Sequence, residues 1–228
     1  MAISWRVVMS FIKVTSTVHD TNWSIRKALK ALETAEMLSF DTETQPVYDK
    51  ATRDTAKGLL KVGITNIKER SHALLAANNS GLSHPSLVNV RHFIFGTSES
   101  SAVVLIVRTE AQELLVWNWL AEYEGTLLIH GALFDLKIMH HRIGKFPKHY
   151  EDTQLLAKSL INHVDVWEAK VGLKELMGEH YDPKWTLIEN YEPANLLDPA
   201  FIRYSGIDGA SCFLLYKQLQ KHIKNTAL

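Results

Sequence analysis

Cysteine, long apolar runs and an excess of charge of one sign are all missing from this sequence. A single cysteine, Cys212, cannot form an internal disulfide. The longest apolar candidates, Ala102–Val107 and Thr126–Ile129, are strand-sized, so no membrane-spanning segment is expected. The 25 Lys and Arg balance the 25 Asp and Glu, so any site for a polyanion must be local. With no recognisable secretory signal, these absences predict a cytoplasmic protein.

The remaining composition is that of an ordinary folded domain. Hydrophobic residues make up 46% and charged residues 22% of the 228 residues, which predicts a single domain over 1–228. Short apolar runs alternate with segments of helical periodicity, and the pattern predicts a mixed α/β fold. The expected strands are Phe11–Thr17, Met37–Asp41, a hairpin of Leu87–Phe95 and Ala102–Val107, and Thr126–His130. The expected helices are Asn22–Thr34, a segment from Thr109 to about Glu124, Leu133–Ile143, Thr153–Leu160, and Pro199 to about Ile223.

Two acids, Asp41 and Glu43, lie at and just after the end of the apolar strand Met37–Asp41. Asp41 and Glu43 are two residues apart, so in a strand both side chains leave the same face. Burying such a pair is costly unless a cation compensates, and carboxylate oxygens suit Mg²⁺ or Mn²⁺. The alternative is a solvated junction between strand and loop. The pair predicts a metal site only in combination with further acids.

Further acids follow at two later points. Asp135 opens a helix directly after the strand Thr126–His130, where the helix dipole alone could explain it. Tyr204 and Asp208 are four residues apart and share one face of a helix, where they could also form a simple surface hydrogen bond.

The order of these segments is more specific than any one of them. FDTET at Phe40–Thr44, GALFD at Gly131–Asp135 and YSGID at Tyr204–Asp208 resemble the three motifs of the DEDD, or DnaQ-like, 3′–5′ exonucleases. The tyrosine places the resemblance in the subclass that includes ribonuclease D and the proofreading domains of family A DNA polymerases. One departure is Gly131, where many relatives have asparagine.

The resemblance implies a ribonuclease-H-like mixed sheet flanked by helices. It also implies two divalent cations, Mg²⁺ or Mn²⁺, held by four acids: Asp41, Glu43, Asp135 and Asp208. Tyr204 is assigned to orienting the attacking water, because a phenol with an ordinary pKa of about 10 is a poor base near neutrality. Thr44 is a candidate contact to the terminal nucleotide, with packing at the strand end as the alternative.

Two other residues have structural interpretations. Asp152 is expected to cap the helix Thr153–Leu160 rather than bind metal. Trp185 could stack a base, but packing is the favoured expectation.

The expected activity is metal-dependent 3′–5′ hydrolysis of single-stranded DNA. The enzyme would act alone or as the proofreading partner of a separate polymerase or replication protein. The same chemistry on RNA, as in ribonuclease D, is the first alternative. A catalytically inactive scaffold that binds nucleic acid is the second.

An insertion, Gln45–Ser86, follows the first motif, and Tyr48–Ala76 within it is predicted to be helical. An apolar face with Leu59 and Ile67 is expected to dock on the body of the domain. Basic residues spaced at helical intervals predict a stripe that binds substrate, chiefly through Lys57 and Lys61, or else an ordinary solvated face. The stripe comprises Lys50, Arg53, Lys57, Lys61 and Lys68.

Overall fold

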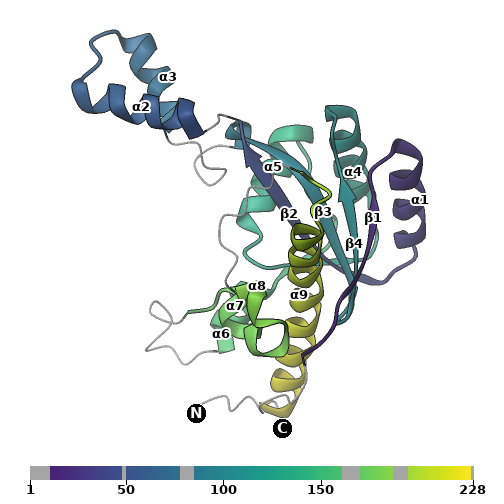
Figure 1. Cartoon of the computed structure of the whole chain (residues 1–228). Coiled ribbons are helices and arrows are strands. Elements are labelled where there is room, and N and C mark those ends of the chain that lie inside the picture. Colours follow the sequence, from purple (N-terminus) through teal and green to yellow (C-terminus); the bar gives the residue numbers. More distant parts are fainter. Residues whose placement is uncertain (1–10, 48–49, 78–84, 161–169, 187–194, 227–228) are drawn as a thin grey trace.

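A six-stranded sheet with helices on both faces forms the body of the protein (Figure 1). The computed structural model describes residues 11–47, 50–77, 85–160, 170–186 and 195–226. The strands are β1 (Thr15–His19), β2 (Met37–Pro46), β3 (Val88–Ser98), β4 (Ser101–Ile106), β5 (Thr126–Ile129) and β6 (Tyr150–Asp152). Their order across the sheet is β1-β4-β3-β2-β5-β6.

The sheet is mixed, as the sequence predicts. β3 pairs with β2 and with β4 in antiparallel fashion, so the predicted hairpin is confirmed. β1 runs parallel to β4, while β2, β5 and β6 run parallel to one another. A bulge lies between Glu43 and Thr44, where the register of β2 against β3 shifts by one residue. This arrangement puts β2, the strand of the acid pair, at the centre of the sheet.

Helices cover the two faces of the sheet in two groups. Those with long apolar faces are α1 (Asn22–Leu32), α4 (Glu110–Glu122), α5 (Leu133–Ile143), α6 (Thr153–Leu160) and α9 (Pro199–Thr226). Shorter elements are α7 (Leu173–Met177), α8 (Pro183–Thr186) and the 3₁₀ turns η1 (Pro85–Leu87) and η2 (Gly178–His180). The core of one face joins α1, α4 and α5 to the sheet and contains Phe40, Phe93 and Trp117. The other core joins α9 to α6, α7 and α8.

α9 lies against β3 at a contact between two glycines. The Ser39 hydroxyl on β2 donates to the Gly209 carbonyl at 2.6 Å and accepts from the Gly96 amide at 3.0 Å. A Cβ at Gly96 would stand 2.5 Å from the Gly209 carbonyl oxygen, which no side chain permits. Glycine at both positions therefore sets how closely α9 approaches the strands.

The structure corrects the predicted ends of several elements. The first strand is Thr15–His19 rather than Phe11–Thr17, because pairing with β4 selects the later residues. The helices after residues 21 and 109 end two residues earlier than predicted, and the last helix ends at Thr226 rather than near Ile223. None of the helices in the described ranges is long and apolar enough to cross a bilayer.

The insertion is helical but differs from the prediction in two ways. It forms two helices, α2 (Lys50–Val62) and α3 (Ile67–Ala77), because Gly63 has φ +86° and interrupts the expected single helix. The start of that predicted helix, residues 48–49, lies outside the described residues.

The predicted docking of the insertion's apolar face on the body is also wrong. Instead α2 and α3 pack on each other, around Ala56 and Ala73, and project beyond the end of β2 (Figure 1). Ile67 is 82% exposed and Leu59 is 48% exposed.

Candidate active site

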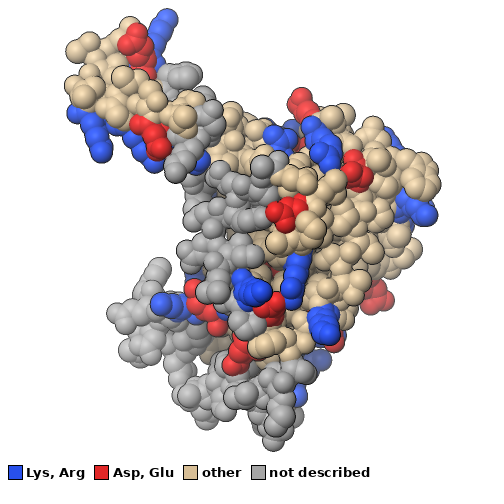
Figure 2. Space-filling model, viewed as in Figure 1, with Lys and Arg blue, Asp and Glu red and all other residues tan. Residues whose placement is uncertain are grey.

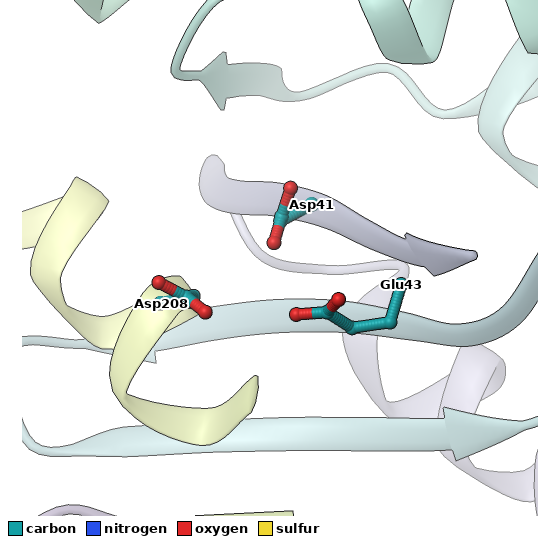
Figure 3. A group of neighbouring side chains, drawn as sticks. All are labelled: Asp41, Glu43 and Asp208. Carbon is teal, nitrogen blue, oxygen red and sulfur yellow. The ribbon is translucent and has the colours of Figure 1, made fainter. Parts of the chain in front are cut away.

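Strand β2 and helix α9 bring the acids of the first and third motifs together. Alternation along β2 sends Asp41 and Glu43 to the face covered by α9, and Thr42 to the opposite face. On α9, Asp208 lies one turn after Tyr204. Figure 3 shows the carboxylates of Asp208 and Glu43 facing each other, with Asp41 beside them. Carboxylate oxygens of the three residues lie within 4.8 Å of one another.

These acids line a cavity of about 290 Å³ between the sheet and α9. Tyr204 on α9 is part of its lining, and His130 and Leu173 line it from two other segments. The full lining is Phe40, Asp41, Thr42, Glu43, His130, Leu173, Tyr204, Asp208 and Cys212.

Burial and mutual repulsion make the acid cluster hard to ionise. Burial raises the pKa of Asp41 to about 6. Burial, reinforced by the Asp41 charge, raises the pKa of Asp208 to about 8. For Glu43, burial and then the charges of Asp41 and Asp208 raise the pKa well above its ordinary value. A cation placed among the carboxylates of these three acids would offset both the cost of burying their charges and the repulsion between them.

The donor set fits a hard divalent cation. Asp208 Oδ1 accepts a hydrogen bond from the Trp185 indole at 3.0 Å. The other oxygen, Oδ2, is buried and has no hydrogen-bond partner within the part of the chain that the structure describes. A buried, unsatisfied carboxylate oxygen next to two further carboxylates offers the all-oxygen ligands that Mg²⁺ and Mn²⁺ prefer.

Asp135 lies beside this cluster rather than within it. It is buried in the first turn of α5, and its Oδ1 accepts a hydrogen bond from the Thr42 hydroxyl at 2.6 Å. Burial and then the Asp41 charge raise its pKa well above the ordinary value, so it is electrostatically coupled to the cluster. Three of the four predicted ligands therefore converge, and a metal-binding role for Asp135 stays a prediction.

Gly131 lies in a turn directly before α5. Gly131 has φ +74°, in the left-handed region that glycine and asparagine adopt most readily. The amides of Gly131 and Ala132 donate to the two oxygens of Asp152 at 3.1 and 2.9 Å. Asp152 also accepts from the amides of Gln154 and Leu155, so the predicted cap of α6 is confirmed. One structural aspartate thus fixes both the turn that carries the second motif and the start of α6.

Tyr204 is placed where the sequence expects it. Its ring stacks on Phe201, with ring centroids 6.1 Å apart. Burial, followed by the charge of Asp208, raises the pKa of its hydroxyl far above the ordinary value. The neutral phenol can therefore donate or accept a hydrogen bond but cannot serve as a base near neutral pH.

Sequence reasoning missed three residues at this site. Thr42 holds Asp135, and its position between the two acids of FDTET was the available signal. Trp185 is buried, as the packing interpretation expects, but its hydrogen bond to Asp208 had no sequence signal. Lys174 on α7 places its ammonium 4.8 Å from the centre of the Tyr204 ring. Only the fold brings these residues together.

Of the three residues predicted to contact substrate, Thr44 lies on the strand of the acid pair, whereas Lys57 and Lys61 lie in the insertion. Thr44 is half-buried on β2 just after the bulge next to Glu43. Lys57 and Lys61 are exposed on α2, in the projecting insertion. Figure 2 shows Lys and Arg on both sides of this insertion in that view, with Asp and Glu among them. Lys68 belongs to α3, so the stripe does not continue along one helix as predicted.

Comparison of the sequence with known families and proteins identifies no relative. No protein-family model matches the chain, and a search of curated proteins finds no match.

Comparison with solved structures shows the fold. RNase D from Escherichia coli, described as an exoribonuclease involved in structured RNA processing, matches with TM-score 0.57 and 12% identity over 94% of this chain. NrnC from Brucella melitensis, solved with bound Mg²⁺, matches with TM-score 0.55 and 16% identity over 94% of this chain. The Nibbler EXO domain of Aedes aegypti matches over the whole chain with TM-score 0.57 and 15% identity.

The matched lengths differ among these neighbours. The chain spans 46% of RNase D, 84% of NrnC and 95% of the Nibbler EXO domain. The predicted mixed α/β fold is confirmed: this chain has the ribonuclease-H-like fold of these nucleases.

Proposed function

We propose that this chain is a metal-dependent 3′–5′ exonuclease that removes nucleotides from single-stranded 3′ ends. The observation that carries the proposal is the convergence of Asp41, Glu43 and Asp208 in one cavity, with a buried carboxylate oxygen left unsatisfied. The nuclease fold of the solved neighbours supports it. An inactive scaffold would gain nothing from keeping three acids whose repulsion opposes ionisation.

Each residue of the cavity is assigned a role in phosphodiester hydrolysis. Bound divalent cations supply charge neutralisation and an activated water. Asp41, Glu43 and Asp208 hold them, and we assign Asp135 to the same set, held by Thr42 until the site is filled. Trp185 fixes one oxygen of Asp208, which leaves the other to bind.

Tyr204 orients the attacking water through its neutral hydroxyl. The stacked Phe201 ring restricts the orientation of the phenol. With this role for Tyr204, we propose that the chain is of the tyrosine subclass. Thr44, next to the acids on β2, is proposed to contact the terminal nucleotide.

The sugar of the substrate is the finer part of the proposal. The sequence predicts single-stranded DNA as the substrate. The neighbours favour RNA as a second candidate, because RNase D is described as an exoribonuclease and NrnC was also solved bound to pGG. The cavity chemistry is the same for both sugars, so a direct comparison has to decide between them.

The test uses single-stranded DNA and RNA of one sequence, each labelled at the 5′ end. Purified protein is incubated with Mg²⁺, Mn²⁺ or chelator, and an oligonucleotide blocked by a 3′-phosphate is run alongside. We expect a metal-dependent ladder that shortens from the 3′ end and is absent for Asp208→Asn. The more rapidly shortened polymer identifies the preferred sugar. A ladder that survives chelator or Asp208→Asn would overturn the proposal.

A further inference from the structure

His92 on β3 is a histidine with an exposed fraction of 0%, buried beside the acid cavity. It pairs in register with Glu43 of β2. Residues directly opposite each other in an antiparallel pair send their side chains to the same face of the sheet, here the face that α9 covers. Because Glu43 lines the cavity, His92 lies one strand away from the cavity, between the sheet and α9.

Hydrogen bonds fix the orientation of the His92 ring. Its Nε2 lies 3.1 Å from the carbonyl oxygen of Leu196, in the segment that precedes α9. Because a carbonyl can only accept, Nε2 carries a proton and donates it to this bond. Nδ1 lies 3.4 Å from the hydroxyl of Ser205 on α9, and that hydroxyl also donates to the Phe201 carbonyl at 2.9 Å. The ring is therefore held at both nitrogens, by one residue before α9 and one within it.

The His92 ring also contacts an aromatic pair that ends at Tyr204. The centres of the His92 and Phe201 rings are 4.6 Å apart. The Phe201 and Tyr204 rings are nearly parallel, with 7° between their planes and 6.1 Å between their centres. Phe201 is buried, so its ring has little room to move between these neighbours. His92, Phe201 and Tyr204 thus form a continuous series of rings from β3 to the lining of the cavity.

We propose that His92 is a positioning residue for hydrolysis, whose ring holds Phe201 and through Phe201 sets the Tyr204 phenol relative to Glu43. The inference rests on the proposed function, in which Tyr204 orients the attacking water. His92 lies opposite Glu43 in the sheet and reaches Tyr204 through α9, so one side chain relates the first motif to the third. Misplacement of a catalytic group by about 1 Å can cost about a hundredfold in rate, so a buried support for the phenol matters.

His92→Gln tests the ring contact. The glutamine amide can still donate to Leu196, but it provides no ring against Phe201. We expect kcat on the better of the two oligonucleotides to fall about fivefold with KM unchanged. In the Tyr204→Phe background, His92→Gln should cause no further loss, because the hydroxyl that it positions is gone.

Val116→Ala is the control for lost packing. It removes buried methyl groups from the core on the opposite face of the sheet. We expect a lower melting temperature, with kcat within about twofold of the matching parent in both backgrounds. An equal loss of kcat from His92→Gln with and without the Tyr204 hydroxyl, or no loss at all, would overturn the proposal.

Fluorine NMR of protein labelled with 3-fluorotyrosine reports the surroundings of Tyr204 without any need for nuclease activity. The Tyr204 signal is the one that disappears in Tyr204→Phe. We expect it to shift in His92→Gln and to stay in place in Val116→Ala, because only the first variant alters the ring beside Phe201. An unchanged signal in His92→Gln would also overturn the proposal. If the wild type cleaved neither DNA nor RNA, the proposed function would fail instead, and this signal alone would decide the role of His92.

Discussion

The acid cavity and the α2–α3 insertion are both attached to β2, but they are built in opposite ways. The cavity lies between the centre of the sheet and α9, where buried hydrogen bonds hold Asp135 and Asp208 and close glycine contacts set the approach of α9. The insertion consists of two short helices that pack on each other around Ala56 and Ala73 and leave Val62 and Ile67 more than 80% exposed. Chemistry that needs sub-ångström placement belongs in the first region. The second is suited to contacts that tolerate variation.

The largest expected effect is the loss of a cluster acid. Asp41→Asn keeps the shape of the side chain but removes a metal ligand, so the cleavage rate should fall by at least about 10³-fold with Mg²⁺ saturating. Asp54→Asn, an exposed acid on α2 in the insertion, is the matched control and should cleave at the wild-type rate. Single-turnover kinetics measure both. Wild-type turnover by Asp41→Asn would remove this residue from the metal site.

The next largest effect is expected when a glycine is replaced by alanine, and the result should differ between the cavity and the insertion. Gly96→Ala forces its Cβ against the Gly209 carbonyl, so α9 must move and carry Asp208 with it. We expect a loss of about 2 kcal/mol in the free energy of unfolding, together with a lower cleavage rate. Gly58→Ala on α2 has no atom within 4 Å of the new Cβ and should stabilise its helix by up to about 1 kcal/mol.

Urea denaturation measures the free energies of both glycine variants. A Gly96→Ala protein as stable and as active as the wild type would show that the approach of α9 is not critical.

Removing one hydroxyl should have a smaller effect on rate. Tyr204→Phe keeps the ring and its contacts, so we expect kcat to fall about tenfold because the attacking water is less well oriented. Tyr216→Phe on the same helix removes a hydroxyl that bonds Glu151 outside the cavity, and its kcat should not change. Equal kcat for Tyr204→Phe and wild type across pH would withdraw the role in orienting water.

The acid cluster should also make the metal-free protein less stable at high pH. Because the folded-state pKa values of Asp41 (about 6) and Asp208 (about 8) lie above the ordinary 3.8, these two carboxyls bind more protons in the folded protein than in the unfolded chain. Buried His92 and His130 have lowered pKa values and act in the opposite direction, but only below their ordinary pKa of 6.5. Stability should therefore fall as pH rises from about 7 to about 8. Melting curves in chelator measure this slope, which should be shallower in Asp208→Asn and unchanged in Asp54→Asn. A slope identical in all three proteins would mean that Asp208 is not protonated in this range.

The smallest effect is expected in the insertion. Lys57→Glu combined with Lys61→Glu should weaken binding of single-stranded nucleic acid and flatten its salt dependence, with kcat unchanged at saturating substrate. Lys27→Glu with Lys30→Glu on α1 makes the same change of charge elsewhere and serves as the control. Fluorescence anisotropy at several salt concentrations reads out both. If the two pairs behave alike, the insertion contributes only general charge.

Local sequence was sufficient for the parts of the site that depend on one element. Alternation placed Asp41 and Glu43 on one face, helical spacing placed Tyr204 above Asp208, and the cap at Asp152 followed from its position before α6. The parts of the site that the sequence did not predict depend on contacts between distant segments. No spacing rule brings Thr42 to Asp135, Trp185 to Asp208 or Lys174 to Tyr204, because each contact requires the finished packing of α5, α8 or α7.

The errors in the insertion have a different origin. Helical periodicity continues across Gly63, so the pattern alone could not separate α2 from α3. The residues that pack between α2 and α3 are Ala56, Leu60, Ile64 and Ala73, whereas Leu59 and Ile67 of the predicted apolar face are exposed. A periodic pattern does not reveal which element packs on a face or which of its residues are covered.

The bulge opposite Glu43 and Thr44 places its extra residue, Arg91, in β3 and not in β2. Because the irregularity lies on the partner strand, β2 runs without an inserted residue from the acid pair to Pro46. The Arg91 side chain reaches back across this point and donates to Gln45 at 3.0 Å. The strand that carries Asp41 and Glu43 is thus also the stem of the insertion, so a displacement of one is passed directly to the other.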